Sequence, residues 1–285
     1  MTTRPDRVPA DEVRQRMLDA GRELALEAGA ALTIEHLRLE EVIQRARVPR
    51  SSVYRLWPYR ESYTDDLLCY LAGEGSWFST RPVYSPETFA MVKQVLTDNA
   101  PLLSTTEGRR ALVCEVVRLT VGHNYDSLTE SVPWRLHMAL TATLGSTRSG
   151  EARTRIAAAL EDAQRRSRES MVALLEYVAG VLGLRLRDPA HTLDHVQLAG
   201  GLLVQSVALR NVQVQAAMGF PDDAAGAADF SAPPEPVFVD SLLNAPIPGP
   251  GLDGKTAEWS LVAFGYLGVL DAFMELDPDF APPVP

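Results

Sequence analysis

Apolar residues recur every three or four positions along most of this chain, the spacing that gathers them on one face of an α-helix. The two-residue alternation typical of a half-buried β-strand is nearly absent, apart from a short ambiguous stretch at residues 236–239. The pattern therefore predicts an all-α fold. With 285 residues, the chain is long enough for two domains of ordinary size.

Four helices are expected in the first quarter of the chain. The first covers residues 13–28 and ends at the glycine that follows. The second covers residues 39–46 and ends before Pro49, because proline disfavours a helical conformation in the residue that precedes it. Pro49 then opens a third helix, which stops at Pro58. A fourth helix is expected over residues 61–72.

Longer helices are expected in the rest of the chain. They cover residues 89–103, 108–121, 134–144, 151–182, 198–214 and 259–274. The last two are apolar on nearly every side, so they must be buried, and two such helices in one domain indicate a subunit interface. Residues 219–256 contain seven Pro and five Gly, a composition that predicts a long loop. This loop is either a passive linker or a lid or arm that reaches a partner subunit.

The charge of the chain is unevenly distributed. Its net charge of −10 argues against a protein that coats nucleic acid or anionic lipid with its whole surface. Residues 1–72 nevertheless carry 11 Arg against 12 acidic residues, whereas the remainder carries 16 cations against 25 acids. Residues 42–60 hold five Arg and no acid. This run is either a basic patch with a function or a solvated helix face.

The residues between these arginines favour a function. Two short helices joined by a tight turn at residues 46–48 match helix-turn-helix geometry, in which the second helix enters the major groove of DNA. The sequence reads LEEVIQRARVPRSSVYRLW at residues 39–57 and PYRE at residues 58–61. It closely resembles the DNA-binding signature of the TetR family of bacterial repressors, and the resemblance covers roughly residues 10–70.

The resemblance and the chemistry of the side chains imply DNA contacts. Arg50 and Ser51 match the family positions that most often read bases, and an arginine can bind a guanine edge in bidentate fashion. Tyr54 and Arg60 match the phosphate-contacting Tyr and Lys of the family, and Arg55 can also neutralise a phosphate. The candidate DNA-contacting residues are Arg47, Arg50, Ser51, Ser52, Tyr54, Arg55 and Arg60.

Two residues depart from the family pattern. Arg47 stands where the family usually has a Gly in the turn, and a side chain at a position that needs a positive φ costs free energy. Pro49 stands where the family usually has a Ser, and proline supplies no oxygen to cap the helix. Both favour an alternative hypothesis, a helical sensor or interaction protein that has lost specific DNA binding.

A candidate ligand pocket follows from residue type. Polar residues at the end of one predicted helix and aromatic and Met residues at the start of the next suit a small apolar effector, although a turn and a core would have the same composition. The candidate residues are His123, Tyr125, Trp134, His137 and Met138.

A third hypothesis is an enzyme built around a histidine pair. His191, Asp194 and His195 fall on one face of a helix, and two His four residues apart can bind a metal. No third ligand can be named, so a solvated helix start is the preferred interpretation. We expect no metal, no cofactor and no catalytic residue.

These observations predict a ligand-responsive transcriptional regulator, a repressor released from a palindromic double-stranded DNA operator by a small apolar or aromatic effector. Residues 1–72 are expected to form a three-helix helix-turn-helix DNA-binding domain. Residues 73–285 are expected to form a larger helical effector-binding and dimerisation domain of a homodimer. The N-terminus lacks the apolar segment of a secretory signal and no long uncharged apolar run exists, so a cytoplasmic location without membrane contact is expected.

Overall fold

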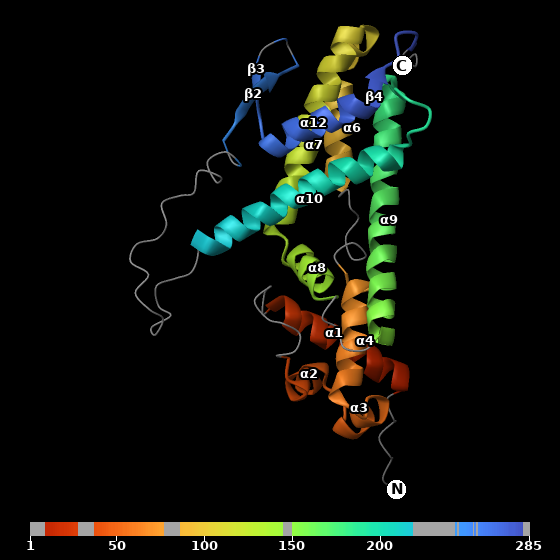
Figure 1. Cartoon of the computed structure of the whole chain (residues 1–285), viewed down its shortest axis with the longest axis vertical. Helices are drawn as coiled ribbons and strands as arrows, with labels where there is room; N and C mark the ends of the chain where they lie inside the picture. Colours follow the sequence, from red (N-terminus) through yellow and green to blue (C-terminus); the bar gives the residue numbers. More distant parts are fainter. Residues whose placement is uncertain are drawn as a thin grey trace. The chain divides into compact units, whose positions relative to one another are not determined.

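Helices make up most of the part of the chain that the structure describes (Figure 1). The computed structural model describes residues 9–27, 37–76, 86–144, 150–218, 243, 245–252, 254 and 256–281. The expectation of a mainly helical fold is confirmed. Within the described residues, no helix is both long enough and apolar enough to cross a membrane.

The chain divides into two compact units, each built from two separate segments. Unit 1 combines residues 1–82 with residues 131–167, and unit 2 combines residues 83–130 with residues 168–285. A helix of the middle of the chain therefore belongs to the same unit as the N-terminal helices.

Unit 1 contains the four predicted N-terminal helices and two elements from the middle of the chain. They are α1 (Ala10–Glu27), α2 (Leu39–Ala46), α3 (Arg50–Leu56), α4 (Arg60–Ala72), α8 (Val132–Thr143) and the first half of α9 (Gly150–Leu182). Val13, Met17 and Val42 are fully buried in its core. Leu136 and Leu140 of α8 are part of the same core, so α8 completes the packing of the N-terminal helices.

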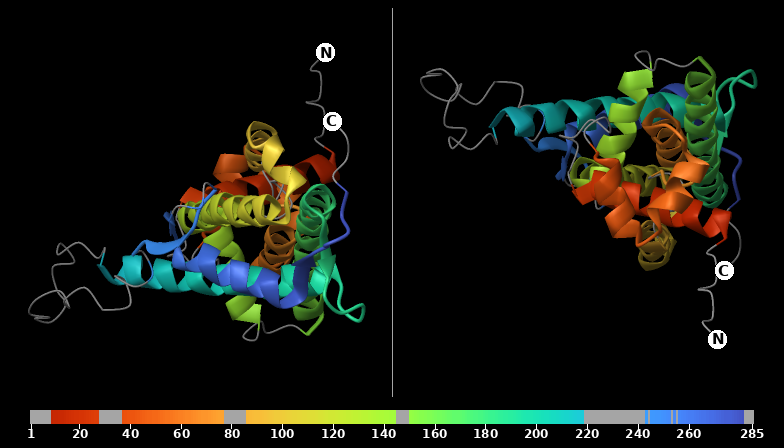
Figure 2. Two further views of the ribbon diagram at one scale, coloured as in Figure 1. Left: turned by 90° about the horizontal axis from the view of Figure 1, so that it is seen from above. Right: turned by 90° about the horizontal axis from the view of Figure 1, so that it is seen from below.

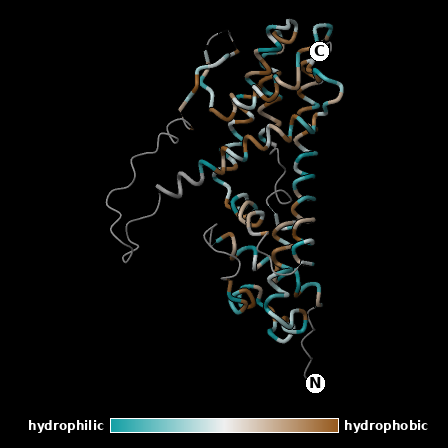
Figure 3. Tube along the Cα trace, in the orientation of Figure 1, coloured by the Kyte–Doolittle hydropathy of each residue, from teal (hydrophilic) through white to brown (hydrophobic). Residues whose placement is uncertain are grey.

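Unit 2 is built from longer helices and short strands. They are α6 (Pro86–Asp98), η3 (Ala100–Ser104), α7 (Thr106–Glu130), the second half of α9, β1 (Leu184–Leu186), α10 (Leu193–Met218), β2 (Ile247–Pro250), β3 (Thr256–Trp259), α12 (Leu261–Phe273) and β4 (Met274–Leu276). Helix α10 packs against α12, and both pack against α7 (Figure 2). Figure 3 shows hydrophobic and hydrophilic residues distributed along these helices.

The short strands differ from the sequence expectation of almost no β-structure. β1 pairs with β4 and β2 pairs with β3, both antiparallel. The second pair lies at the end of the predicted loop, whose residues up to 242 are outside the described residues, as is the ambiguous stretch at 236–239. Trp259 packs over Gly249, where a Cβ atom would lie 2.7 Å from the indole ring, and its Nε1 donates to the carbonyl of Pro250 at 3.1 Å.

Several predicted helix ends were wrong; the helix expected over residues 198–214, for example, is α10 and spans Leu193–Met218. Helix α6 ends at Asp98, before Pro101, and the residues predicted to continue it form the 3₁₀ turn η3. Helix α7 continues to Glu130, through the polar residues near His123 that were read as its end. It continues because Tyr125 and Leu128 of the extension are buried, which the polar residues between them conceal in the sequence.

Candidate nucleic-acid interface

A tight turn connects α2 to α3. Arg47 ends α2 in the left-handed conformation, with φ 53° and ψ 46°, and its backbone N–H donates to the carbonyl of Gln44. Pro49, predicted as the first residue of α3, lies just before it, and no side chain caps the helix. The turn therefore adopts the conformation expected of a glycine without having one.

Buried aromatic residues fix α3 on the unit 1 core. Val53 and Trp57 are almost completely buried, as expected from the sequence. The Trp57 and Tyr63 rings meet edge to face with centroids 5.3 Å apart, and the Tyr63 hydroxyl donates to the carbonyl of Met17 at 3.0 Å. Burial also raises the pKa of Tyr63, so this hydroxyl stays protonated.

A single carboxylate joins the end of α3 to the neighbouring helices. Asp66 of α4 accepts a hydrogen bond from the Trp57 Nε1 at 2.9 Å. The same carboxylate lies 2.7 Å from the Arg14 guanidinium of α1 and 2.9 Å from that of Arg155 in α9. Asp66 is only 13% exposed, so these contacts are partly shielded from water. The position of α3 thus depends on a shared acceptor.

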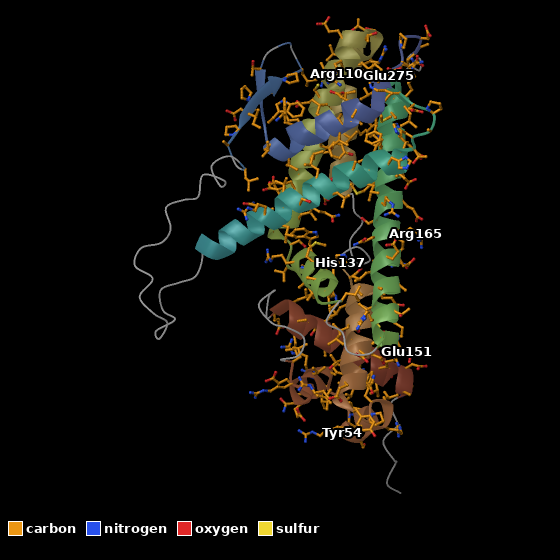
Figure 4. All side chains as sticks on the ribbon, in the orientation of Figure 1. Tyr54, Arg110, His137, Glu151, Arg165 and Glu275 are labelled. Atoms are coloured by element: carbon orange, nitrogen blue, oxygen red, sulfur yellow. The ribbon has the colours of Figure 1, made fainter. Side chains whose placement is uncertain are left out.

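The outer side of α3 and its turn carries cations that have no acidic partner. Arg47, Arg50, Ser51 and Arg55 are exposed, and Tyr54 of α3, labelled in Figure 4, is 48% exposed. Within the part of the chain that the structure describes, Arg47, Arg50 and Arg55 form no ion pair and no side-chain hydrogen bond. Their charges are free to attract an anion.

Three other predicted or neighbouring residues differ from this set. Ser52 is only 9% exposed, so it is the predicted DNA contact least able to reach a ligand. Arg60 is exposed, and its guanidinium donates to the carbonyl of Leu37 at 3.1 Å. Arg45 pairs with Glu27 at 2.6 Å and this pair lowers the pKa of the Glu27 carboxyl, so Arg45 is already neutralised.

Two exposed residues near α3 and its turn were not among the DNA contacts predicted from the sequence. Arg38 precedes α2 and forms no ion pair among the described residues, and Tyr59, which precedes α4, is 71% exposed. Because Arg60 contacts the carbonyl of Leu37, the backbone of Arg38 lies near Arg60. The DNA contacts predicted from the sequence were chosen from the acid-free run between Val42 and Arg60. Arg38 lies before that run and was therefore not among the candidates. We call Arg38, Arg47, Arg50, Tyr54, Arg55 and Arg60 the basic surface.

The predicted pocket residues are divided between the two units. His123 and Tyr125 lie on α7 in unit 2, whereas Trp134, His137 and Met138 lie on α8 in unit 1. His137, labelled in Figure 4, is 1% exposed, and burial lowers its pKa to about 4. None of the five residues lines the apolar cavity of unit 2 described below.

His191, which precedes α10, and His195, in its first turn, are held by local contacts. The His195 Nδ1 accepts a hydrogen bond from the backbone N–H of Thr192 at 3.0 Å, and its ring lies edge to face with that of His191. Asp194 lies 3.7 Å from the Arg168 guanidinium. Among the residues that the structure describes, no group of three or more His, Cys, Asp or Glu side chains could hold a metal ion.

No protein-family model matches this chain, and no curated protein matches it either. The function of the basic surface must therefore be derived from its own chemistry. That surface combines five exposed guanidinium groups with the half-exposed Tyr54 side chain, within a chain whose net charge is −10. Such a group of donors suits a polyanion that approaches from one side only.

Proposed function

We propose that this protein is a ligand-responsive transcriptional regulator that binds double-stranded DNA through a helix-turn-helix formed by α2 and α3. The observation that carries the proposal is the set of exposed arginines on α3 and the turn before it that have no ion-pair partner among the described residues. The resemblance of residues 39–61 to the TetR signature supports the same reading and favours a repressor that acts in the cytoplasm.

The side chains of the basic surface divide into two roles. Arg50, in the first turn of α3, reads a guanine through its O6 and N7 atoms, a contact worth about 1–3 kcal/mol of discrimination against another base. Ser51 beside it is small enough to let the helix approach the base edges. Arg47, Tyr54 and Arg55 bind phosphates, so they position the helix without specifying the sequence. Arg38 and Arg60 extend the phosphate contacts beyond α3.

A palindromic operator requires two copies of the chain, and unit 2 offers a surface for pairing. Large apolar side chains of the packed helices α10 and α12 remain at least one-third exposed in the single chain. They are Leu198, Leu202, Leu209, Leu261 and Phe264. We call them the apolar face. Water contact with this face is unfavourable, and a second copy of the same face would remove it.

The first test is a binding titration at several salt concentrations, with DNA from beside the gene and scrambled DNA of equal length. We expect a preference of about a thousandfold for one site and a steep loss of affinity with salt. Equal, weak binding to both DNAs would be followed by selection from a random-sequence library. If no preferred sequence emerged from that library, the proposal would be refuted.

Variants then separate the two roles within the basic surface. Arg50→Ala should relax the preference at one base pair, whereas Arg55→Ala should weaken binding to all sequences and reduce the salt slope by about 1. The matched control is Arg185→Ala, which also removes one exposed guanidinium but from unit 2, where it pairs with Glu275. If the control weakened binding as much as Arg55→Ala, net charge rather than this surface would govern the affinity.

Dimerisation has its own test. Leu202 is 57% exposed, so Leu202→Arg should not disturb the folded chain but should prevent pairing by placing a charge in the apolar face. Light scattering should report a dimer for the wild type and a monomer for this variant. Phe89→Arg, at another exposed aromatic residue on α6, is the control and should remain dimeric. A monomeric wild type at micromolar concentration would refute the pairing.

Two features of the turn favour a second candidate function, a helical sensor or interaction protein without sequence-specific DNA binding. Arg47 occupies a left-handed position that suits glycine, and α3 begins without a side-chain cap. This candidate predicts that no DNA sequence is preferred in the titration or in the library selection.

A further inference from the structure

An apolar cavity lies between helices of unit 2. It has a volume of about 50 Å³ and is lined from α7, α9, α10, α12 and β1. Val117, Met171 and Leu174 are among the aliphatic side chains that form most of its walls. A single buried water occupies only ~10–15 Å³ of such a cavity, so there is room for a small molecule. Met171 is flexible enough to enlarge it.

Charge is missing from the lining of this cavity. Of the described residues that line it, none is Asp, Glu, Lys, Arg or His. Burying an ion among such side chains without a partner carries a large desolvation penalty. The lining therefore excludes carboxylates, phosphates and amines as preferred ligands.

A few uncharged polar groups interrupt the apolar walls. The Tyr266 hydroxyl donates to the Gln197 Oε1 at 3.3 Å, and both side chains are buried. Within the described chain, the Gln197 amide N–H groups have no acceptor, and Asn124 forms no side-chain hydrogen bond. The Thr120 hydroxyl donates to its own helix at 2.7 Å, which leaves only its acceptor capacity for a ligand. The cavity thus offers amide donors in an otherwise apolar space.

We propose that this cavity binds a small, uncharged, mainly apolar molecule whose hydrogen-bond acceptor meets the Gln197 amide. Apolar walls supply the affinity, and the amide sets the orientation, as is usual for small-molecule sites. The identification of this molecule as the effector rests on the proposed function, whereas the binding itself does not require DNA.

The test uses the full-length protein with its methionine methyl groups labelled for NMR and three probes of equal chain length: 1-butanol, butyrate and butylammonium. Met171 lines the cavity and reports binding there. Met17, fully buried in unit 1, is the internal control. The Met171 signal, assigned with Met171→Leu, should shift saturably with 1-butanol at about tenfold lower concentration than with either ion. The Met17 signal should not move.

Two variants locate the site. Gln197→Leu should weaken 1-butanol binding by about fivefold, because one hydrogen bond to the ligand is lost. Gln94→Leu makes the same change at an exposed position of α6 and should leave binding unchanged. Val117→Leu fills part of the cavity and should also weaken binding. Circular dichroism checks that each variant is folded.

Three results would overturn the proposal: no saturable shift of Met171, equal affinity for butyrate, or parallel shifts of Met17 and Met171. Without a saturable shift of Met171, the cavity does not bind the probe. Equal affinity for butyrate contradicts the preference for uncharged ligands, and parallel shifts of both methionines indicate a general solvent effect. A saturable shift of Met171 without any effect of 1-butanol on operator affinity would support the site and separate it from the proposed regulation. Conversely, a lack of DNA preference in the operator titration would refute the proposed function without affecting the evidence for ligand binding in the cavity.

Discussion

Arg47 should carry a measurable conformational cost. Within the part of the chain that the structure describes, it is the only non-glycine residue with a positive φ, at 53°. A Cβ atom in this conformation costs about 1–2 kcal/mol. Glycine avoids this cost but loses about 0.5–1 kcal/mol more backbone entropy on folding. The difference predicts that Arg47→Gly is more stable than Arg47→Ala by about 0.7 kcal/mol.

The comparison of these two variants isolates the backbone, because both lack the guanidinium. Thermal unfolding followed by circular dichroism should give Arg47→Gly a melting temperature about 2 °C above that of Arg47→Ala. Arg47→Asn should fall between them, since asparagine tolerates the left-handed conformation better than alanine. In DNA titrations both Gly and Ala variants should lose about one unit of salt slope relative to the wild type.

The strain in the turn and the role of the Arg47 charge are tested separately. Equal melting temperatures for Arg47→Gly and Arg47→Ala would mean that the turn relaxes and stores no strain. A tenfold difference in their DNA affinities would mean that the turn geometry, not the charge, controls binding.

Three further changes follow from the contacts described above. Asp66→Ala leaves the buried Trp57 indole without its hydrogen-bond acceptor. The free energy of unfolding should therefore fall by about 1–3 kcal/mol, and operator binding should weaken. An unchanged midpoint of denaturant unfolding would contradict this expectation. The pKa of His137 is lowered to about 4 in the folded chain, so its stabilising effect is complete above the unfolded pKa and is lost as the pH falls toward 4. Between pH 7 and pH 5 this loss should be about 2 kcal/mol in urea titrations, and His137→Gln but not His195→Gln should remove it. Leu128→Ala, in the extension of α7, should cost about 2–5 kcal/mol because that side chain is buried; a cost below 1 would place the end of α7 nearer Val121.

Local signals in the sequence were sufficient to predict the helices of unit 1. Pro49 and Pro58 mark the ends of short helices, and α2 begins and ends at the residues expected from its apolar spacing. The long α9 was also predicted to within one residue, because its apolar stripe is continuous.

Contacts between distant parts of the chain were not predictable in the same way. Nothing near Leu136 or Leu140 indicates that they pack with α1 to α4, because such packing leaves no periodic pattern. For the same reason the pocket residues chosen by type do not line the cavity, whose walls come from five separate elements. Strand β2 contains Pro248 and Gly249, residues that disfavour a strand, so only its pairing with β3 reveals it.

The interleaving of the two units has a consequence for the order of events during protein synthesis. Unit 1 includes residues up to 167, so the packing of its core is incomplete when the first 82 residues have left the ribosome. At about 5–20 residues per second, several seconds pass before α8 and the first half of α9 arrive. During that interval the unfinished core exposes apolar side chains such as Met17 and Val42. The nascent N-terminal helices are therefore expected to be substrates for chaperones until the middle of the chain has been made.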